Sequence, residues 1–359
     1  MIVFRSVPAV AALVLAGSLA VQVRASAATT DDAEAAVAED LDQSPDEELP
    51  LGDLSGEGRW SVLTDNLRWA LDVAGRVDVN TRDGSLTHVE FVGIDLHKVV
   101  STSKRDIGTL LVQLYGEGDD GDWKYKTRLL YFNYLASGGG GFNIRFGHIL
   151  VPYGLNLPSR TPGTLRQYIA GRNIGFKADW GASVNGVLPE WNYEISLTRG
   201  SGVDFKSHDS PYLVSGRIGS SMERPLVAGL SALYGDVLGK NGVVRKARVG
   251  ADVRWLGGPV DVRAELSYGR DDRTTDVLNA FGEISWWSPE ESVMGYVQGR
   301  FFMNKPANAW QETSYLTVGA RIHVLRYIWL SADYRHGLTR DSRAQNPDVF
   351  RAQIRYRFF

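Results

Sequence analysis

The feature that most constrains this chain is an alternation of apolar and polar residues that begins at Leu67 and continues to the C terminus. In LRWALDVAGRVDVN, apolar residues take alternate positions from Leu67 to Val79, and Asp72, Arg76 and Asp78 take positions between them. A period of two is that of a β-strand, whereas a helix repeats every three or four residues. RVGADVRWL, VDVRAELSY, YLTVGARIHV and YIWLSADYR repeat the pattern, so we predict an all-β fold.

The number of such segments and the way the chain ends favour a closed barrel. The alternation predicts about sixteen antiparallel strands, an even number of the kind that transmembrane up-and-down β-barrels use. In a bilayer every backbone polar group must be paired, so the first strand should pair with the last, FRAQIRYRFF. We expect its lipid-facing residues to be Phe350, Ala352, Ile354, Tyr356 and Phe358, and its lumen-facing residues to be Arg351, Gln353, Arg355 and Arg357.

The connections add a second signal. Short ones, such as LPEW and LGGP, are expected to alternate with longer ones, such as GEGDDGDW, GRDDRTTD and HGLTRDSRAQNP, as in barrels with short periplasmic turns and long extracellular loops. The longest, LVPYGLNLPSRTPGTLRQYIAGRN, would be the third extracellular loop. Its apolar and aromatic content predicts an ordered loop, either above the rim or inside the lumen.

The N-terminal region differs from the rest. Residues 1–27 have the charged start, apolar stretch and Ala25-Ser26-Ala27 cleavage site of a secretory signal peptide. Residues 28–58 are acidic and are predicted to be a disordered periplasmic segment. The barrel is predicted to span residues 59–359, where basic residues outnumber acidic ones. The chain has no cysteine, so no disulfide holds this exported protein together.

Basic side chains are predicted to dominate the lumen, with Arg76, Arg300, Arg335 and Arg351 among those facing inward. Fixed cations in a narrow aqueous path favour anions. The alternative is that wall arginines pair with acids across strands, as Arg248 with Asp261 or Arg263 with Asp252, and only stabilise the barrel. The predicted constriction and anion-binding residues are Arg145, Arg160, Arg166, Arg172, Lys177, Lys124, Lys126 and Arg128.

Two resemblances to known proteins refine these predictions. The ending resembles the aromatic C-terminal signature that the bacterial barrel-assembly machinery reads, although the alternation here counts back from Phe358 rather than Phe359. FNIRFGHILVPYGLNLP, GRNIGFKADWGASVNG and WNYEISLTRGSG, within residues 142–202, resemble the phosphate-selective porin O/P-like family. That resemblance implies sixteen strands, an inward-folded third loop and a homotrimer.

Phosphate-specific members of that family carry many lysines at the constriction, whereas the loop here has arginines and no lysine. The sequence therefore predicts a basic outer-membrane porin for small anions or other solutes, in contact with lipid. It suggests no enzyme activity, cofactor, metal ligand set or nucleic-acid partner. Two alternatives remain: a barrel that houses a partner protein such as a cytochrome, and an outer-membrane hydrolase using His208 or His336 with Asp209 or Asp341.

Overall fold

The computed structural model describes a defined part of the chain: residues 52–53, 66–102, 105–119, 122–137, 140–155, 164–167, 170–204, 210–221, 224–239, 242–272, 274–305, 309–339, 342 and 348–358. The predicted signal peptide, residues 1–27, and most of the acidic segment, residues 28–58, lie outside these residues. Two residues of the acidic segment, Gly52 and Asp53, form a short strand opposite Trp69 and Arg68.

The described residues form seventeen strands and one short helix. The strands are β1 (Gly52–Asp53), β2 (Leu67–Asn80), β3 (Leu86–Ser101), β4 (Asp106–Asp119), β5 (Asp122–Leu135), β6 (Asn143–Leu150), β7 (Ala178–Val187), β8 (Trp191–Thr198), β9 (Tyr212–Ser220), β10 (Leu226–Gly239), β11 (Gly242–Gly257), β12 (Val260–Asp271), β13 (Thr275–Trp287), β14 (Val293–Lys305), β15 (Gln311–Leu325), β16 (Ile328–Gly337) and β17 (Val349–Phe358). The helix is α3 (Ala170–Ile174).

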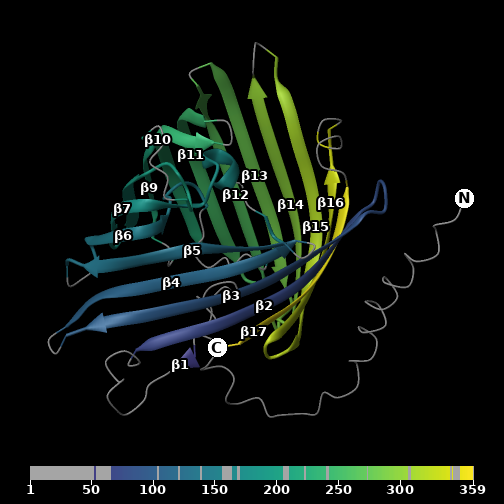
Figure 1. Cartoon of the computed structure of the whole chain (residues 1–359), viewed down its shortest axis with the longest axis horizontal. Coiled ribbons are helices and arrows are strands. Elements are labelled where there is room, and N and C mark those ends of the chain that lie inside the picture. The colour runs from purple at the N-terminus through teal and green to yellow at the C-terminus, as the bar shows by residue number, and fades with distance from the viewer. Residues whose placement is uncertain are drawn as a thin grey trace, which may run out of the picture. The chain divides into compact units, whose positions relative to one another are not determined.

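Strands β2 to β17 close into a sixteen-stranded antiparallel barrel, as the alternation predicted. Each strand pairs with its neighbour along the chain, and β17 pairs with β2 from Val349↔Asn80 to Phe358↔Leu71 (Figure 1). Every barrel strand therefore has two hydrogen-bonded neighbours, which removes the exposed sheet edge that hydrocarbon would not tolerate. Within the described part of the chain, no helix has the length and apolarity that a membrane crossing requires.

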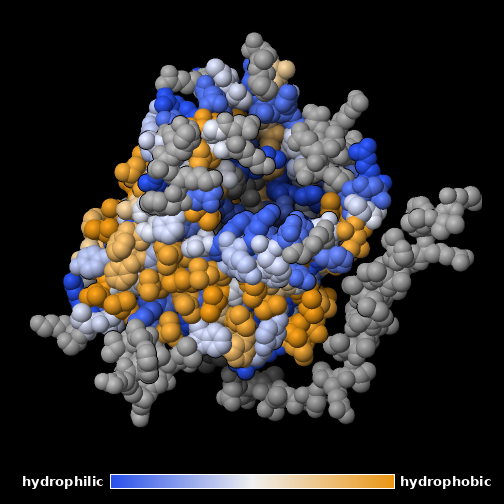
Figure 2. Space-filling model, viewed as in Figure 1, coloured by the Kyte–Doolittle hydropathy of each residue, from blue (hydrophilic) through white to orange (hydrophobic). Residues whose placement is uncertain are grey.

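The two faces of the wall have opposite character. On β17, Arg351 and Gln353 are buried in the interior, while Ile354, Tyr356 and Phe358 are exposed on the outside, which confirms the predicted orientation. Figure 2 shows hydrophobic side chains gathered over the lower left of the view, where β3 to β6 lie, with hydrophilic side chains around the hollow above them. This is the arrangement expected where lipid surrounds a polar lumen.

Aromatic side chains cover one end of the closing seam, where β17 ends and β2 begins. The ring centroid of Phe358 lies 5.3 Å from that of Trp69 on β2 and 5.7 Å from that of Tyr327 in the turn before β16. Tyr327 also meets Tyr356, at 6.3 Å. Aromatic residues favour the membrane interface, so this cluster explains why an exposed chain end carries phenylalanine and tyrosine.

The loop pattern differs in part from the prediction. Long connections do occur at one end, at residues 151–177, 199–211 and 338–348. However, GEGDDGDW and GRDDRTTD are not long loops, because β4, β5, β12 and β13 continue through most of both stretches. Charged, turn-rich sequence at these places belongs to strand ends, where strand pairing rather than local composition decides the structure.

In LTHVEFVGIDLHKVV, residues 86–100, neither parity is cleanly apolar, a pattern that suggests a β-bulge. The structure has one register shift between this stretch and β4, at its end, between Val100 and Ser101. Along β3 the mixed parity has another cause, since Phe91 is buried and faces Tyr115, while Glu90, one position earlier, is exposed. An apolar residue on the inner face and a charged one on the outer face obscure the alternation without breaking it.

Candidate functional site

The loop after β6 enters the barrel and binds its inner wall. The Tyr153 hydroxyl lies 2.6 Å from Ser267 Oγ on β12, and the Gly154 amide donates to Ser231 Oγ on β10 at 2.9 Å. The next amide, Leu155 N–H, donates to a carboxylate oxygen of Glu265 at 2.9 Å. Gly154 has a φ of +61°, and a Cβ there would collide with that carboxylate, so only glycine fits this contact.

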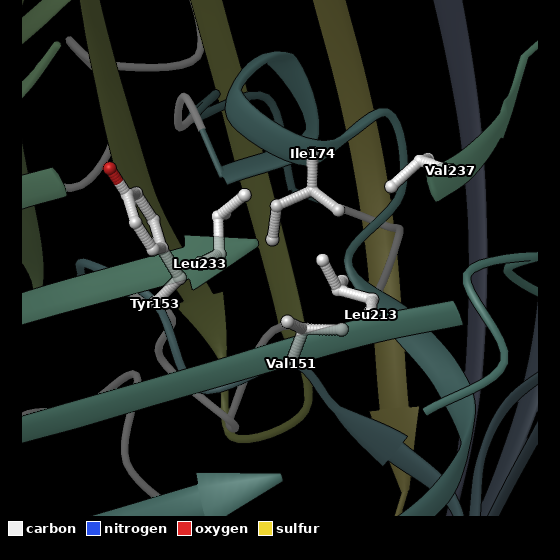
Figure 3. Close-up of a cluster of buried hydrophobic side chains, with 6 residues drawn as sticks. All are labelled: Val151, Tyr153, Ile174, Leu213, Leu233 and Val237. Carbon is white, nitrogen blue, oxygen red and sulfur yellow. The ribbon is translucent and has the colours of Figure 1, made fainter. Parts of the chain in front are cut away.

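Apolar packing holds the same part of the loop. Val151 and Tyr153 from the start of the loop and Ile174 from α3 pack with side chains of β9 and β10 (Figure 3). The wall residues of this cluster are Leu213, Leu233 and Val237. The cluster is fully or almost fully buried, so both ends of the described loop are fixed to one side of the wall.

Asn173 of α3 connects the loop to two further wall residues. Its amide nitrogen donates to Glu265 at 2.8 Å, and its amide oxygen accepts from Asn279 of β13 at 2.7 Å. Glu265 therefore accepts hydrogen bonds from both described ends of the loop. The third loop lies inside the barrel, as the fold prediction stated.

Residues 164–167 reach a different sector of the wall. Arg166 forms a buried ion pair with Glu283 of β13, and the Gln167 amide donates to Gln298 of β14 at 3.3 Å. The Leu165 carbonyl accepts from Arg351 of β17 at 3.0 Å. The loop thus has contacts on β10, β12, β13, β14 and β17, and it narrows the lumen between them.

The predicted loop arginines do not form one cluster. Arg166 is buried against Glu283, whereas Arg172 is exposed, with its guanidinium 4.8 Å from the centre of the Phe302 ring. Lys177 is exposed just before β7. Arg160 lies outside the described residues.

The predicted basic residues on the strands are also dispersed. Arg145 of β6 pairs with Glu194 at 2.9 Å and lies 4.8 Å from the Tyr131 ring centre. Lys124 is exposed and Lys126 half-buried on β5. Arg128 follows them at a register shift between β4 and β5, within electrostatic reach of Asp95. The structure therefore brings only part of the predicted set near the loop.

Most inward arginines pair with carboxylates along the wall, as the structural alternative predicted, but with other partners. Arg248 pairs with Asp271 at 2.7 Å rather than with Asp261. Arg263 pairs with Asp261 rather than with Asp252, which instead binds Arg217 at 2.6 Å. The two suggested pairs are wrong for different reasons. Arg263 pairs with an acid on its own strand, and Arg248 pairs with an acid of β12 at a different level from Asp261.

Arg300 of β14 and Arg335 of β16 are different. Within the described residues, neither forms an ion pair with a carboxylate. Both contact the buried Tyr315 of β15, with guanidinium carbons 5.4 and 5.5 Å from its ring centre. Arg300 is only 7% exposed, and its one hydrogen bond in this part of the structure goes to the side chain of Gln167. The sequence already indicated that Arg300 has no acid beside it on the same face of its own strand, since the neighbours on that face, Gln298 and Phe302, are neutral.

A cavity of about 420 Å³ lies beside Arg335, between Gln167 of the loop and the wall. Its charged lining residues are Arg76, Asp78, Asp119, Arg335 and Arg351. Its uncharged lining residues are Asn80, Ser85, Thr87, Val89, Gln167 and Val349. Arg351 is held by Asp333 and Arg76 by Asp78, which leaves Arg335 as the lining arginine without a carboxylate partner in the described structure.

No constellation for the alternative hydrolase is visible in the described residues. His336 Nδ1 lies 2.8 Å from Asp348, while His208, Asp209 and Asp341 lie outside the described part. Nor do the described residues contain a group of His, Asp or Glu side chains that could hold a metal ion.

No protein-family model matches the sequence, and no curated protein matches it. Solved structures do match its fold. The chain is similar to Salmonella typhi OmpF in complex with daunomycin, at 14% identity and a TM-score of 0.62, covering 81% of this chain and 97% of that one. The anion-selective porin from Comamonas acidovorans has 14% identity and a TM-score of 0.60, covering 81% and 99%.

OmpT of Vibrio cholerae, in its trimer form, is also similar, at 10% identity and a TM-score of 0.61, with 81% and 99% covered. The chain has the fold of the sixteen-stranded bacterial porins. A closed barrel with an apolar outer face is the architecture of the bacterial outer membrane, and the chain is assigned to that membrane. These similar structures do not single out the phosphate-selective porins.

Proposed function

We propose that this protein is an outer-membrane porin: a water-filled channel for passive diffusion of small solutes and ions, with a mild preference for anions, phosphate included. The observation that carries the proposal is a polar lumen narrowed by an inward loop, with Arg300 and Arg335 lacking carboxylate partners in the described structure at the narrowed part. Fixed positive charge at a constriction lowers the barrier for anions and raises it for cations.

The preference is expected to be mild because most wall arginines are neutralised. Arg351, Arg355 and Arg217 each hold a carboxylate through two nitrogen atoms. Such pairs contribute little net field to the lumen, so only the uncompensated arginines act on a passing ion. The similar porin described as anion-selective supports the proposal without deciding it.

The loop also bears on the alternatives. A barrel that houses a cytochrome or another partner needs a lumen free for that partner, whereas this loop binds five strands of the inner wall. We therefore favour a channel over a conduit, and a transport protein over an enzyme. We also propose a homotrimer, supported by the trimer form of the similar OmpT, and delivery by the barrel-assembly machinery through β17.

The reversal potential in a planar bilayer tests the proposal. Purified full-length protein is placed between unequal KCl concentrations, and the sign of the zero-current potential reports which ion crosses more easily. We expect a modest zero-current potential with the sign that results when chloride crosses more easily than potassium. A potential of the sign set by potassium would remove the anion preference, and the absence of any conductance would remove the channel.

A further inference from the structure

The charged residues that line the cavity of about 420 Å³ compensate one another, except for two. Arg76 binds Asp78 at 2.8 Å, and Arg351 is held by a carboxylate of β16 through Nε and Nη2. Each of these two guanidinium groups therefore has its own acid, and the two pairs add no net charge. The charged lining residues that remain are one arginine, Arg335, and one acid, Asp119.

Arg335 presents the end of its guanidinium group to the cavity. Its Cζ lies 5.5 Å from the centre of the Tyr315 ring, which supports the group from one side. Nε is fully enclosed, but the side chain as a whole is only partly buried and lines the cavity. Within the described residues, neither Nη1 nor Nη2 forms a hydrogen bond or an ion pair. Two nitrogens of one planar guanidinium group match the two oxygens of a carboxylate.

Asp119 presents a carboxylate to the same cavity from another strand. It ends β4 opposite Val89 of β3, which is buried on the inner face and also lines the cavity. Asp119 is exposed, and its side chain has no hydrogen bond or ion pair in the part of the chain that the structure describes. A carboxylate without a cation beside it attracts an ammonium group.

Arg335 and Asp119 are too far apart to pair with each other. From β16, which carries Arg335, four steps through β17, β2 and β3 lead to β4, roughly 19 Å along the wall at about 4.8 Å per strand. The register adds an offset, because Arg335 lies level with Asn80 of β2 and Asp119 with Arg76. That offset is roughly 13 Å at about 3.3 Å per residue. Side chains cover part of the distance, and a ligand that contacts both must be longer than an α-amino acid.

The lining between the two charges offers hydrogen bonds of both kinds. Gln167 of the loop accepts from Arg300 through its side-chain oxygen, so its amide nitrogen is left to donate to a ligand. Asn80, Ser85 and Thr87 also line the cavity. A peptide unit has one donor and one acceptor, which amide and hydroxyl side chains can satisfy together. The volume of the cavity is sufficient for a molecule of this size.

We propose that this cavity is a saturable binding site for short peptides of two or three residues, with the terminal carboxylate on Arg335 and the terminal ammonium on Asp119. The site rests on the proposed function, since a solute reaches it through the lumen. It names a class of solute that a general anion preference does not favour, because a peptide with two free termini and neutral side chains carries no net charge.

The first test is inhibition of the ion current by triglycine, in planar bilayers containing the purified full chain. At about pH 6 both peptide termini are charged. In symmetric KCl, the current should fall hyperbolically to a plateau as triglycine is added. N-acetyltriglycine keeps the length and the carboxylate but lacks the ammonium, and it should need a roughly 10-fold higher concentration. Glycine has both charges at too short a spacing and should be weaker by a similar factor. Equal inhibition by the acetylated peptide would overturn the site.

The second test changes the two charged residues. Arg335→Gln and Asp119→Asn should each raise the half-inhibiting triglycine concentration roughly 10-fold, as expected for a lost charged hydrogen bond. Arg335→Glu combined with Asp119→Lys exchanges the two charges. The double variant should therefore bind triglycine in the opposite direction and recover much of the affinity that each single reversal loses. A merely structural role of the two residues would not produce this recovery.

Arg270→Gln is the matched control. Arg270 is an exposed arginine of β12 that pairs with Asp276 and does not line the cavity, so wild-type inhibition by triglycine is expected. A loss in this variant as large as in Arg335→Gln would show that net charge, rather than the cavity, governs inhibition. Unchanged inhibition in both Arg335→Gln and Asp119→Asn would also overturn the site.

The wild-type protein alone keeps the site testable if a variant fails to assemble. A conducting protein whose current declines linearly with triglycine, without a plateau, would overturn the site and leave the proposed channel standing. A protein without any conductance would overturn both.

Discussion

Arg355 of the last strand binds Asp72 of the first barrel strand across the seam that closes the barrel, with Nε 2.8 Å from a carboxylate oxygen. Asp72 also accepts from Arg357 at 3.3 Å, and Arg357 continues to Asp95 of β3 at 2.8 Å. The side chains on the inner face thus reinforce the backbone ladder at the point where the chain's two ends meet.

We expect Asp72→Ala to destabilise the barrel by about 3 kcal/mol or more, because two largely buried guanidinium groups lose their shared carboxylate. Urea unfolding in lipid vesicles, followed by tryptophan fluorescence, measures the free energy of unfolding. Asp276→Ala breaks the exposed pair with Arg270 and should cost about 1 kcal/mol at most. Equal losses in the two variants would show that the seam pair has no special role.

Glu265 holds both described ends of the inward loop. Glu265→Ala removes the acceptor of Leu155 N–H and of the Asn173 amide, so the loop should leave its wall position more often. We expect more frequent conductance steps or a larger mean conductance in single-channel recordings. Ser267→Ala, which removes only the partner of the Tyr153 hydroxyl, should produce a smaller change. Identical traces for wild type and Glu265→Ala would contradict the proposed role of this anchor.

The outer face should tolerate charge only near the ends of strands. Leu266 lies in the middle of β12 and is 53% exposed, so Leu266→Arg would place a guanidinium in hydrocarbon, at a cost of about 2–4 kcal/mol. Leu325 ends β15 and is 63% exposed, and Leu325→Arg should cost about 1 kcal/mol or less. The difference in unfolding free energy between the two variants is the readout, and no difference would mean that lipid does not contact this face.

One contact outside the strands, around Asp348, should depend on pH. Asp348, just before β17, accepts from the Gly337 amide at 2.9 Å, from His336 at 2.8 Å and from the Tyr334 hydroxyl at 3.2 Å. Partial burial raises the pKa of Asp348, but these three hydrogen bonds lower it further than burial raises it, so the net shift is downward.

A pKa that is lower in the folded barrel than in the unfolded chain means that Asp348 stabilises the fold above the ordinary carboxyl value of about 4. This contribution is lost as pH falls through the lowered folded pKa of Asp348. We expect the Gly337 amide to be protected from hydrogen exchange near neutral pH and to lose protection in acid. In Asp348→Asn the protection should vary little with pH, and a wild-type profile in that variant would exclude Asp348 as the cause.

The sequence predicted the fold well because the membrane imposes a strict rule on each strand. On β17, Arg351 and Ile354 face opposite media, and this contrast is visible in the residue types alone. Loop ends were harder to predict. At β4 and β5 the charged residues Asp119 and Asp122 still pair, since a strand that rises above the bilayer needs no apolar face.

The site was predicted only in part, because its arginines pair with acids that lie far from them in the sequence. Whether an arginine is neutralised depends on which acid lies on the neighbouring strand at the same level, as with Arg217 and Asp252. The sequence places Arg300 and Arg335 on the inner face but does not show that Tyr315 lies between their strands or that Gln167 reaches them. The loop's path across the lumen supplies that information.

The conductance of single molecules tests the central claim, a closed and water-filled passage, most directly. Purified protein added to a planar bilayer in symmetric KCl should produce discrete, ohmic current steps that persist without any energy source. The steps should grow in proportion to bulk conductivity, as expected when ions cross in water. A protein that inserts as a folded barrel yet passes no current would contradict this account.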